Sequence, residues 1–557
     1  MNDVLPQPPA TKVARRPSLV LAAAAAFLTA LVVLASTEAA RTNSATWDET
    51  LYLFLGRQAL LTNDYSGFAA LGVAPLPVRL TWTAGVLDPI HAEANDPAVF
   101  RQRVERGRAN AVAWFAVPLV LFILVIVSTA YGHIAGVVAA GLVALSPNVM
   151  AHASLATTDV AFALTFLVGL AAQIHYLRRR SWLSAIAVAA AHGVALATKY
   201  SAIGLYLIFI AMLAIRRRET HWKRDLTALA GGLAMAWSLH GWHVAPLFAE
   251  NGTAATLIAT IAGPIGVSPD FIDALRQLPA PIMLRGIAAQ IYLERAGQEA
   301  FLLGEVSQFG WWYYFPVAVA MKSTLVELAA FGAFAMLVFR RRWRDVETQV
   351  VIVAVLLYGG LALLGRRDLG VRYVLPIMIL TIITAVAWGS DLLKGRKWAP
   401  AVAGAALAIQ AFSFAGIAPE FLAYFNGLAG GPARGYTRLV DSNLDWGQDL
   451  LRLRDWLSVH SEVDAGLAYF GSAPLSAYDV QPADWRTLNR PPVDGRKHMF
   501  VLSATYLQGI FLCGDPFAGF RAIEPSARIG YSLMVYDVGR DNVSRALGAA
   551  AADACAP

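Results

Sequence analysis

The chain has 557 residues, of which 57% are hydrophobic and only 15% are charged, and its mean hydropathy is +0.52. Soluble domains have about 45–50% apolar and about 25% charged residues, so this composition excludes an ordinary soluble protein. The formal net charge of +7 does not indicate nucleic-acid binding, because the basic residues form short clusters between apolar stretches.

Apolar stretches recur along the first 418 residues, and each is close to the roughly 20 residues that cross a bilayer as a helix. The first, 17–40, is long for a signal peptide and lacks a convincing cleavage site, so we expect it to be retained. The stretches predict about eleven spanning helices. The others are expected at about 109–130, between His133 and Ser146, at 159–177, in a hairpin around Lys199, at 226–247, at 312–339, in a hairpin around 365–373, and at 398–418.

Basic clusters set the expected orientation, because Lys and Arg in short loops stay in the cytoplasm. Five clusters fall on one side: Lys12, Arg15 and Arg16; 178–180; 216–218; 340–344; and 394–397. Segments 41–108 and 248–311 then become large outer loops. Four arginines at 101–108 are the exception, and we expect segment 95–108 to form either a basic helix near anionic lipid heads or a solvated charged face.

Residues 419–557 have a different composition, richer in charge, Gly and Pro. Short apolar runs at 465–470, 498–502 and 530–538 predict strands, and 452–457 predicts a helix. The predicted fold is therefore an all-α polytopic membrane domain over 1–418, followed by a small extracytoplasmic α/β domain over 419–557. The two cysteines, Cys513 and Cys555, favour one disulfide in an oxidising compartment, with free thiols as the alternative.

Two sites on the outer side carry unexpected acidic residues. Asp48 and Glu49 follow the first span, where a carboxylate could act as a general base or simply favour a helix N-terminus. Asp159 opens the span at 159–177 directly after Thr158, where helix capping is the competing explanation.

Cations occupy short outer turns that the topology rule says should avoid them. Lys199 lies in the first hairpin turn, where a phosphate partner or snorkelling to the interface would explain it. Arg366, Arg367 and Arg372 lie in the second turn, and the planar fork of arginine suits phosphate. An internal ion pair with Asp368 is the alternative.

The second large loop ends in Glu305 and an aromatic run that includes Trp311 and Trp312. Such a run is typical of the membrane interface, and aromatic faces also stack on sugars. Lys322, about two turns below Pro316, could reach back up to a lipid head group. Carboxylates and cations on one face fit the transfer of a sugar from a lipid phosphate, which needs a base for the acceptor and cations for the leaving phosphate.

The residues Asp48-Glu49, Thr158-Asp159, Lys199-Tyr200 and the stretch 372–376 resemble the protein O-mannosyltransferase-like branch of GT-C glycosyltransferases, which includes the lipid A aminoarabinose transferases. The segments 301–316, 424–426 and 441–449 resemble a bacterial subgroup of that branch. The similarity covers most of the chain and keeps the motifs in order.

This resemblance implies an inverting transferase that uses a polyprenyl-phosphate sugar in an outward-facing cavity. Asp48, with Glu49 beside it, would take the place of the catalytic acidic residue, and Asp159 that of the second acidic residue. Lys199 and Arg372 would hold the phosphate, with Arg366 and Arg367 as looser assignments. Sugar or acceptor contacts are expected from Tyr52, Glu305, Trp311, Trp312 and Tyr373.

Some members of the branch hold a metal in their outer loops, but His91, His152 and Glu305 are scattered here. We therefore expect no required metal and no cofactor besides the lipid-linked substrate. The run 443–448 is polar enough to bind sugar, or it docks the C-terminal segment and caps the helix at 449–457.

The predicted location is a bacterial inner membrane with the active site facing the periplasm. The alternative function is a transporter or flippase for lipid-linked sugars, which would place polar residues across mid-membrane. The sequence leaves the sugar, the lipid length, the acceptor and the oligomeric state open.

Overall fold

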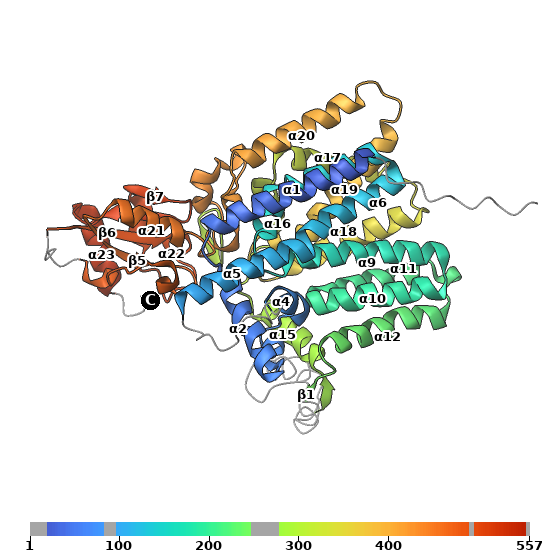
Figure 1. Ribbon diagram of the computed structural model, residues 1–557, viewed down its shortest axis with the longest axis horizontal. Coiled ribbons are helices and arrows are strands. Elements are labelled where there is room, and N and C mark those ends of the chain that lie inside the picture. Colours follow the sequence, from blue (N-terminus) through green and yellow to red (C-terminus); the bar gives the residue numbers. More distant parts are fainter. Residues whose placement is uncertain (1–18, 83–95, 247–277, 489–494, 553–557) are drawn as a thin grey trace, which may run out of the picture.

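The computed structural model describes residues 19–82, 96–246, 278–488 and 495–552. Long apolar helices lie side by side and a small β-sheet sits beyond one end of them (Figure 1). The helices of this bundle are α1 (Leu19–Thr42), α5 (Pro97–Ala111), η1 (Val112–Ala116), α6 (Val117–Tyr131), α7 (His133–Ala144), α8 (Pro147–Ala153), α9 (Asp159–Arg179), α10 (Trp182–Thr198), α11 (Ile203–Ile215), α12 (Trp222–Leu239), α16 (Tyr314–Lys322), α17 (Leu325–Val338), α18 (Val346–Leu364), α19 (Leu375–Leu392) and α20 (Ala399–Ala415).

The chain is a multi-pass membrane protein. Within the described ranges, five helices are long and apolar enough to cross a membrane, or six if the bent pair α7–α8 counts as one span. α5, η1 and α6 together form the longest of them, Pro97–Tyr131. Four further apolar helices have only 10–17 residues. The total of about eleven spans stays a prediction.

The predicted span 312–339 is a broken helix, and the predicted span that ends near Ser146 is followed by a sharply bent short helix; each break has a local cause. α7 and α8 meet at an angle of 67°, where the Ser146 hydroxyl caps the start of α8 and Pro147 follows it. The predicted span 312–339 divides into α16 and α17 at Ser323. There, Thr324 and Glu327 form a capping box, in which each side chain bonds the other's backbone N–H.

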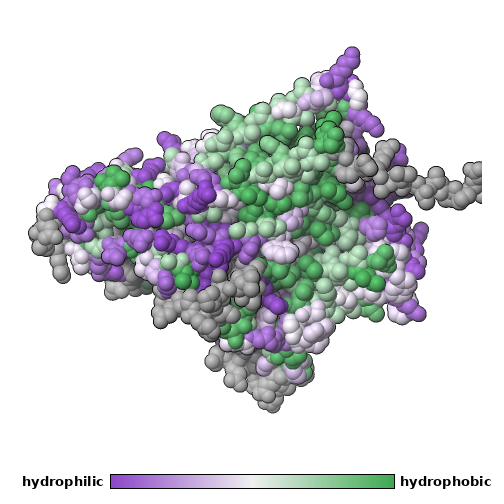
Figure 2. Space-filling view, viewed as in Figure 1, coloured by the Kyte–Doolittle hydropathy of each residue, from purple (hydrophilic) through white to green (hydrophobic). Residues whose placement is uncertain are grey.

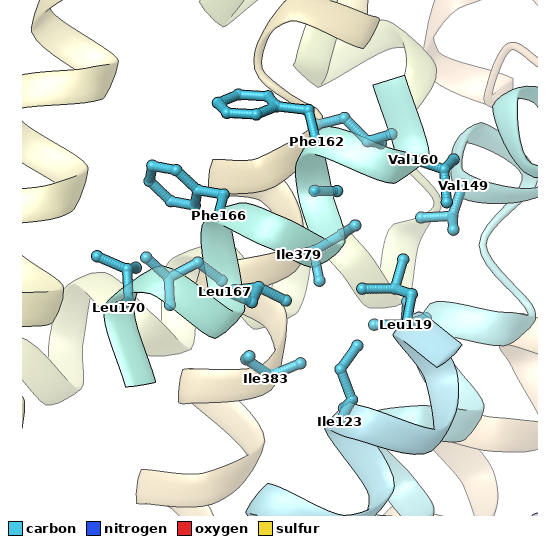
Figure 3. Close-up of a cluster of buried hydrophobic side chains, with 14 of the residues drawn as sticks. Leu119, Ile123, Val149, Val160, Phe162, Phe166, Leu167, Leu170, Ile379 and Ile383 are labelled. Atoms are coloured by element: carbon cyan, nitrogen blue, oxygen red, sulfur yellow. The ribbon is translucent and has the colours of Figure 1, made fainter. Parts of the chain in front are cut away.

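The core of the bundle lies between α6, α9 and α19. Leu119 and Ile123 of α6 lie near Ile379 of α19 on one side of α9, whereas the Phe162 and Phe166 rings of α9 point the other way, toward α18 (Figure 3). All five side chains are buried. Helices approach closely where residues are small: a Cβ on Gly136 of α7 would lie only 2.7 Å from the Leu124 carbonyl oxygen of α6. This tight packing holds the helix ends near the sheet in a fixed arrangement.

The basic clusters of the connections gather at the bundle end away from the sheet. Arg178, at the end of α9, lies 3.2 Å from Glu347 at the start of α18. Arg216, after α11, donates to the Gln349 side chain at 2.9 Å, and Arg341 pairs with Asp391 at 2.9 Å. Figure 2 shows hydrophobic surface over the helices between two hydrophilic ends. Lys12, Arg15 and Arg16 lie outside the described residues.

The first large loop folds into α2 (Trp47–Thr62), α3 (Ser66–Ala70), α4 (Pro75–Trp82) and the exposed start of α5. Segment 95–108 is largely helical as predicted, because the Asp96 carboxylate caps the first turn of α5. Neither expectation, a helix near anionic lipid heads or a solvated charged face, holds at Arg108, because its side chain is buried. The second loop contributes β1 (Val244–Pro246), β2 (Pro279–Pro281), α15 (Ile282–Ala296), β3 (Ala300–Leu302) and β4 (Glu305–Ser307).

The C-terminal segment contains a four-stranded sheet in the order β5-β6-β8-β7. β5 and β6 are parallel and the other pairs antiparallel. The predicted runs overlap β5, β6 and β8, whereas the short β7 was not predicted. The elements are α21 (Leu450–Val459), β5 (Val463–Ala468), β6 (Lys497–Ser503), α22 (Ala504–Leu507), β7 (Ala527–Ile529), β8 (Leu533–Asp537) and α23 (Asp541–Ala552).

The C-terminal segment shares its apolar cores with the rest of the chain. Phe500 and Leu502 of β6 belong to the same buried cluster as Tyr314 and Phe315 of α16. Whether 419–557 is a domain of its own therefore stays a prediction. Cys513 is not a free thiol, but Cys555 lies outside the described residues, so the predicted disulfide also stays a prediction.

Candidate functional site

A cavity of about 490 Å³ lies where the helix bundle meets the outer loops and the C-terminal segment. Its walls come from α2, from the starts and ends of the bundle helices, from α15 and from loops of the C-terminal segment. Its charged and polar lining comprises Asp48, Tyr52, Thr158, Thr198, Lys199, Ser201, Gln290, Glu294, Gln298, Arg367, Arg372, Tyr373, Asp441 and Tyr506.

Four residues that are far apart in the sequence come together here: Asp48, Lys199 and Arg372 line the cavity, and Asp159 is not in the lining but pairs with both cations. The guanidinium of Arg372 lies 2.6 Å from the Asp48 carboxylate and 3.9 Å from that of Asp159. The Lys199 ammonium lies 2.7 Å from the other oxygen of Asp159. Two carboxylates and two cations thus form one alternating chain. Of the residues named from the sequence as acids and as phosphate ligands, these four are neighbours in space.

The bundle positions Asp159 and Lys199 at helix ends. Asp159 begins α9 and Lys199 directly follows α10, so the packing of these two helices brings the residues together. Thr158 makes no side-chain capping bond, and the Thr157 hydroxyl donates to Asp159 instead. Helix capping by Thr158 therefore does not account for this motif.

Arg372 is held by the C-terminal segment. It lies on the turn η5 (Val371–Tyr373), and the Trp446 ring centroid is 4.2 Å from its guanidinium carbon. The Asn443 side chain accepts the backbone N–H of Val371 at 3.1 Å. Gly370 permits this close approach, because its φ is +120° and a Cβ there would lie 2.6 Å from the Ser442 hydroxyl. The run predicted either to dock or to bind sugar thus docks onto the arginine turn, and Trp446 also lines the cavity.

One N–H group of the Arg372 guanidinium has no hydrogen-bond partner among the described residues. This group is the Nε–H, which is buried. Burial opposes its positive charge, but Asp48, Tyr373 and the other nearby acidic groups outweigh burial and raise the pKa of Arg372. Arg372 is therefore a permanent cation in the cavity lining, and its Nε donor is buried.

The adjacent residues Asp48 and Glu49 have different environments, which corrects their treatment as a catalytic pair. Asp48 lines the cavity, whereas Glu49 is fully buried behind it and accepts two bonds from Arg108 at 2.7 and 2.8 Å. Its carboxylate also accepts the backbone N–H groups of Thr46 and Ala156. Burial would raise the pKa of Glu49, but the Arg108 charge and these bonds lower it. Glu49 is thus part of the scaffold.

Arg366 and Arg367, the two less certain phosphate ligands, have different positions in the structure. Arg367 lines the cavity and donates to the Gln298 side chain at 2.9 Å. Arg366 lies outside the lining and packs its guanidinium over the Phe309 ring at 5.4 Å. The expectation that Arg366 contacts the phosphate is therefore not supported by its position.

Of the predicted sugar contacts, Tyr52 and Tyr373 line the cavity, and Glu305, Trp311 and Trp312 do not. Trp312 is 71% exposed, as expected for an interfacial aromatic residue. The Trp311 backbone N–H donates to one oxygen of Asp368 at 2.7 Å, and the other oxygen of this carboxylate, which was expected to pair with an arginine, is buried without a hydrogen-bond partner among the described residues. Burial raises the pKa of Asp368 to about 7.

Lys322 does not reach a lipid head group, contrary to the expectation. Its side chain is buried and donates to the backbone carbonyls of Leu422 at 2.7 Å and Asn443 at 2.5 Å. These bonds tie the C-terminal segment to α16. The lysine therefore supports the arginine turn through Asn443.

Sequence reasoning missed two parts of the lining. One is the polar face of α15 and the following turn, with Gln290, Glu294 and Gln298 spaced four residues apart. That spacing places side chains on one face of a helix and was a usable signal. The other is Asp441 together with three aromatic residues of the C-terminal segment: Phe470, Tyr506 and Phe511. No local pattern distinguishes these from core residues.

The described residues contain no group of three or more His, Cys, Asp or Glu side chains arranged to hold a metal ion. His91 lies outside the described residues, His152 is buried beneath Trp446, and Glu305 is exposed on β4. The expectation that no metal or cofactor is required stays a prediction.

Part of the chain matches a known protein family. Residues 98–242 match the family described as dolichyl-phosphate-mannose-protein mannosyltransferase. The resemblance inferred from the sequence is confirmed over this stretch, which includes Asp159 and Lys199. No curated protein matches the chain significantly.

Three solved structures are similar to the chain at low identity. A crystal structure of ArnT from Cupriavidus metallidurans bound to undecaprenyl phosphate is 13% identical, with a TM-score of 0.47 over 93% of this chain and 98% of that one. The same protein in the apo state is 15% identical, with a TM-score of 0.30 over 94% and 98%. The oligosaccharyltransferase AglB from Archaeoglobus fulgidus, in complex with an inhibitory peptide and a dolichol-phosphate, is 11% identical, with a TM-score of 0.42 over 86% and 71%. These similarities do not by themselves establish a shared fold.

Proposed function

We propose that this protein is a membrane glycosyltransferase that moves a sugar from a polyprenyl-phosphate donor to an acceptor outside the cytoplasm. The observation that carries the proposal is that Arg372 and Lys199 line one cavity together with Asp48, and that Asp159, which is not in the lining, pairs with both cations. The family match over 98–242 supports the same class of reaction.

The cations suit the phosphate of the donor. Arginine offers a planar fork of donors that matches phosphate oxygens, and Lys199 adds a second positive charge on the same wall. As the bond between the sugar carbon and the phosphate oxygen breaks, its electron pair stays with the phosphate. Arg372 and Lys199 stabilise that charge in a site shielded from bulk water.

Asp48 is the residue proposed to accept the proton. Its carboxylate is paired with Arg372 at 2.6 Å. A phosphate that engages Arg372 would compete with this ion pair and leave the Asp48 carboxylate available. The acceptor oxygen then attacks the sugar carbon from the side opposite the phosphate, which inverts that carbon, and its proton passes to Asp48. Asp159 positions Lys199 and Arg372 for this step.

The proposed location is a bacterial inner membrane with the cavity facing the periplasm. The cavity lies at the bundle end opposite the basic clusters that are described, and such clusters stay cytoplasmic. A polyprenyl chain is apolar, so the head group of the donor would lie at the membrane boundary where these cations are.

The test is a transfer assay with purified protein, a panel of radiolabelled polyprenyl-phosphate hexoses and pentoses, and membrane extract as the source of acceptor. We expect label to move to extract material with wild-type protein. Arg372→Ala should weaken donor binding at least about tenfold, because it removes a charge-assisted bond to phosphate. Arg366→Ala is the matched control, since Arg366 lies in the same loop outside the cavity.

Wild-type protein that transfers no label from any donor would contradict the enzyme. If the protein instead moved the labelled lipid across vesicle membranes without transfer, the alternative of a lipid-linked-sugar transporter would replace it. If Arg372→Ala bound the donor with full affinity, Arg372 would not be a phosphate ligand, and the proposed transferase activity itself would be unaffected by that result.

A further inference from the structure

The cavity has a second side, chemically unlike the cation side, and it is built mainly by the C-terminal segment. Phe470, Tyr506 and Phe511 come from that segment, and Trp47 of α2 joins them. These four residues are called the aromatic wall below. Asp441 lies in the lining with them. The proposed phosphate chemistry uses none of these five residues.

The aromatic wall is an ordered stack. The Phe470 ring lies 5.3 Å from Trp47 at an interplanar angle of 15°, and 5.4 Å from Phe511 at 13°. Tyr506 meets Phe470 edge-on at 5.8 Å. Three nearly parallel rings therefore join α2 to two separate loops of the C-terminal segment. Stacked rings of this kind fix one another and offer a rigid apolar surface.

Two of the residues in this part of the lining have left-handed backbones. Asp441 has a φ of +53° and Phe511 a φ of +61°. Asp tolerates this conformation fairly well, but for a bulky residue such as Phe it is a strained exception. Such strain persists only where the surroundings enforce it, and it concentrates at functional sites. The chain thus holds a carboxylate and an aromatic ring in the cavity at a cost in backbone energy.

No side chain donates a hydrogen bond to the Asp441 carboxylate in the part of the chain that the structure describes. The carboxylate accepts a bond from the Ser442 backbone and also lies within the electrostatic influence of Arg372. The backbone N–H of Asp441 donates to the Thr505 hydroxyl at 3.2 Å, which anchors the turn. Of the other carboxylates in the lining, Asp48 is paired with Arg372, and Glu294 accepts the Arg366 backbone N–H.

We infer that Asp441 and the aromatic wall form a carbohydrate subsite, in which the rings pack on the C–H face of a sugar and the carboxylate accepts bonds from its hydroxyl groups. Rings that supply apolar contact, together with one placed polar group that fixes orientation, are what a small-ligand site requires. The subsite rests on the proposed function, since it would hold a sugar next to the lipid phosphate. Two sources share this chemistry: the sugar of the donor and a sugar of the acceptor.

The experiment compares ligands with and without a sugar. Affinities for bare polyprenyl phosphate and for the panel of polyprenyl-phosphate sugars are measured in detergent for wild type, Asp441→Asn and Phe511→Gly. Asn keeps the left-handed backbone and removes the charge, and Gly removes the ring while relieving the strain at φ +61°. Neither substitution is therefore expected to unfold the protein.

The controls share the backbone conformation but lie elsewhere. Asp479, with a φ of +57°, is exposed on the C-terminal segment, and Leu303, with a φ of +55°, is 44% exposed between β3 and β4. Asp479→Asn and Leu303→Gly should leave the affinity for every ligand unchanged.

We expect Asp441→Asn to weaken binding of the preferred sugar-bearing lipid about tenfold, and Phe511→Gly about fivefold, with bare polyprenyl phosphate unaffected. If donor affinity were unchanged but the membrane-extract concentration giving half-maximal transfer rose by similar factors, the subsite would hold the acceptor sugar. Variants that change neither quantity would overturn the subsite. Wild-type protein that binds no polyprenyl phosphate would overturn the proposed function and, with it, this inference.

Discussion

Asp48 and Glu49 show how far two identical charges can differ when they are neighbours on a helix. Consecutive residues on α2 point about 100° apart, so one carboxylate faces the cavity and the other faces the core. Glu49 meets Arg108, and both side chains are almost inaccessible. A buried ion pair contributes little compared with an apolar pair, but a broken one leaves an uncompensated charge.

Glu49→Gln should therefore destabilise the protein strongly, by about 3–5 kcal/mol, because the buried Arg108 loses its counter-charge. Thermal unfolding in detergent measures the loss. Glu38→Gln is the control, since Glu38 pairs with Arg41 at 3.9 Å on the surface and should cost at most about 1 kcal/mol. Adding Arg108→Met to Glu49→Gln should restore much of the stability and activity. If the Glu49→Gln protein were stable but inactive, Glu49 would have a catalytic role instead of a structural one.

We expect the stability of the protein to depend on pH because of the buried Asp445 carboxyl group. Burial raises its pKa to about 7, above the roughly 3.9 of an unfolded chain. Between these pH values only the folded state holds the proton, so stability falls as the pH rises and is lowest above about 7. We expect wild type to unfold at a lower temperature at pH 8 than at pH 5.

Asp445→Asn should reduce this difference, because the amide carries no charge at either pH. Each pKa unit removed is worth about 1.4 kcal/mol. Asp441 and Asp368, whose pKa values burial also raises to about 7, should retain part of the dependence. Asp464→Asn, at a partly exposed position on β5, is the control. Parallel unfolding profiles for Asp445→Asn and wild type would show that Asp445 does not titrate in this range.

At the scale of elements, the turn η5 and the loop at 441–446 work as one unit. Asn443 bonds both Val371 of the turn and Tyr314 of α16, and Trp446 covers Arg372. Asn443 does not line the cavity, so any effect it has on a ligand must pass through the arginine turn. The C-terminal segment therefore helps to orient Arg372, in addition to the ion pairs of this cation with Asp48 and with Asp159 of the bundle.

Asn443→Ala should lower the affinity for bare polyprenyl phosphate several-fold, since the arginine turn loses the bond at Val371. Asn443→Asp keeps an oxygen that can accept this bond and should retain more of the affinity. Asn426→Ala is a matched control: Asn426 is equally buried and bonds the carbonyls of Ala320 and Ser323, away from Arg372. If both alanine variants had the same affinity for bare polyprenyl phosphate, Asn443 would have no specific role in positioning Arg372.

The elements that could be predicted from the sequence are those for which a single physical signal, such as a long apolar run, dominates. Long apolar runs located α1, α9 and α19 to within a few residues, because burial in lipid leaves little alternative to a helix. The signal fails where contacts are made at long range. Nothing near Glu49 reveals that Arg108 will face it, and nothing near Phe470 reveals the stack with Trp47 and Phe511. The charged side of the cavity was predictable because misplaced charges stand out in a membrane chain, whereas aromatic residues do not.

At the scale of the whole molecule, charge is divided between two ends. The cavity lies at the end of the bundle nearest the sheet, and the ion pairs of the basic connections lie at the other. The 21 residues of α9 run from Asp159 at the cavity to Arg179 among the basic residues, a length of about 30 Å. That length equals the hydrocarbon thickness of a bilayer. One helix thus connects the two aqueous faces.

This geometry makes the orientation testable with two single-cysteine probes. Thr220 is exposed between α11 and α12 at the basic end, and Val306 is exposed on β4 at the cavity end. In right-side-out vesicles, a membrane-impermeant maleimide should label Val306→Cys strongly and Thr220→Cys only after permeabilisation. Inverted vesicles should reverse the pattern, and wild type controls for Cys513 and Cys555. Labelling of both probes from one side would mean that the bundle does not cross the membrane between them. The opposite pattern would place the cavity, and any transfer reaction in it, on the cytoplasmic face.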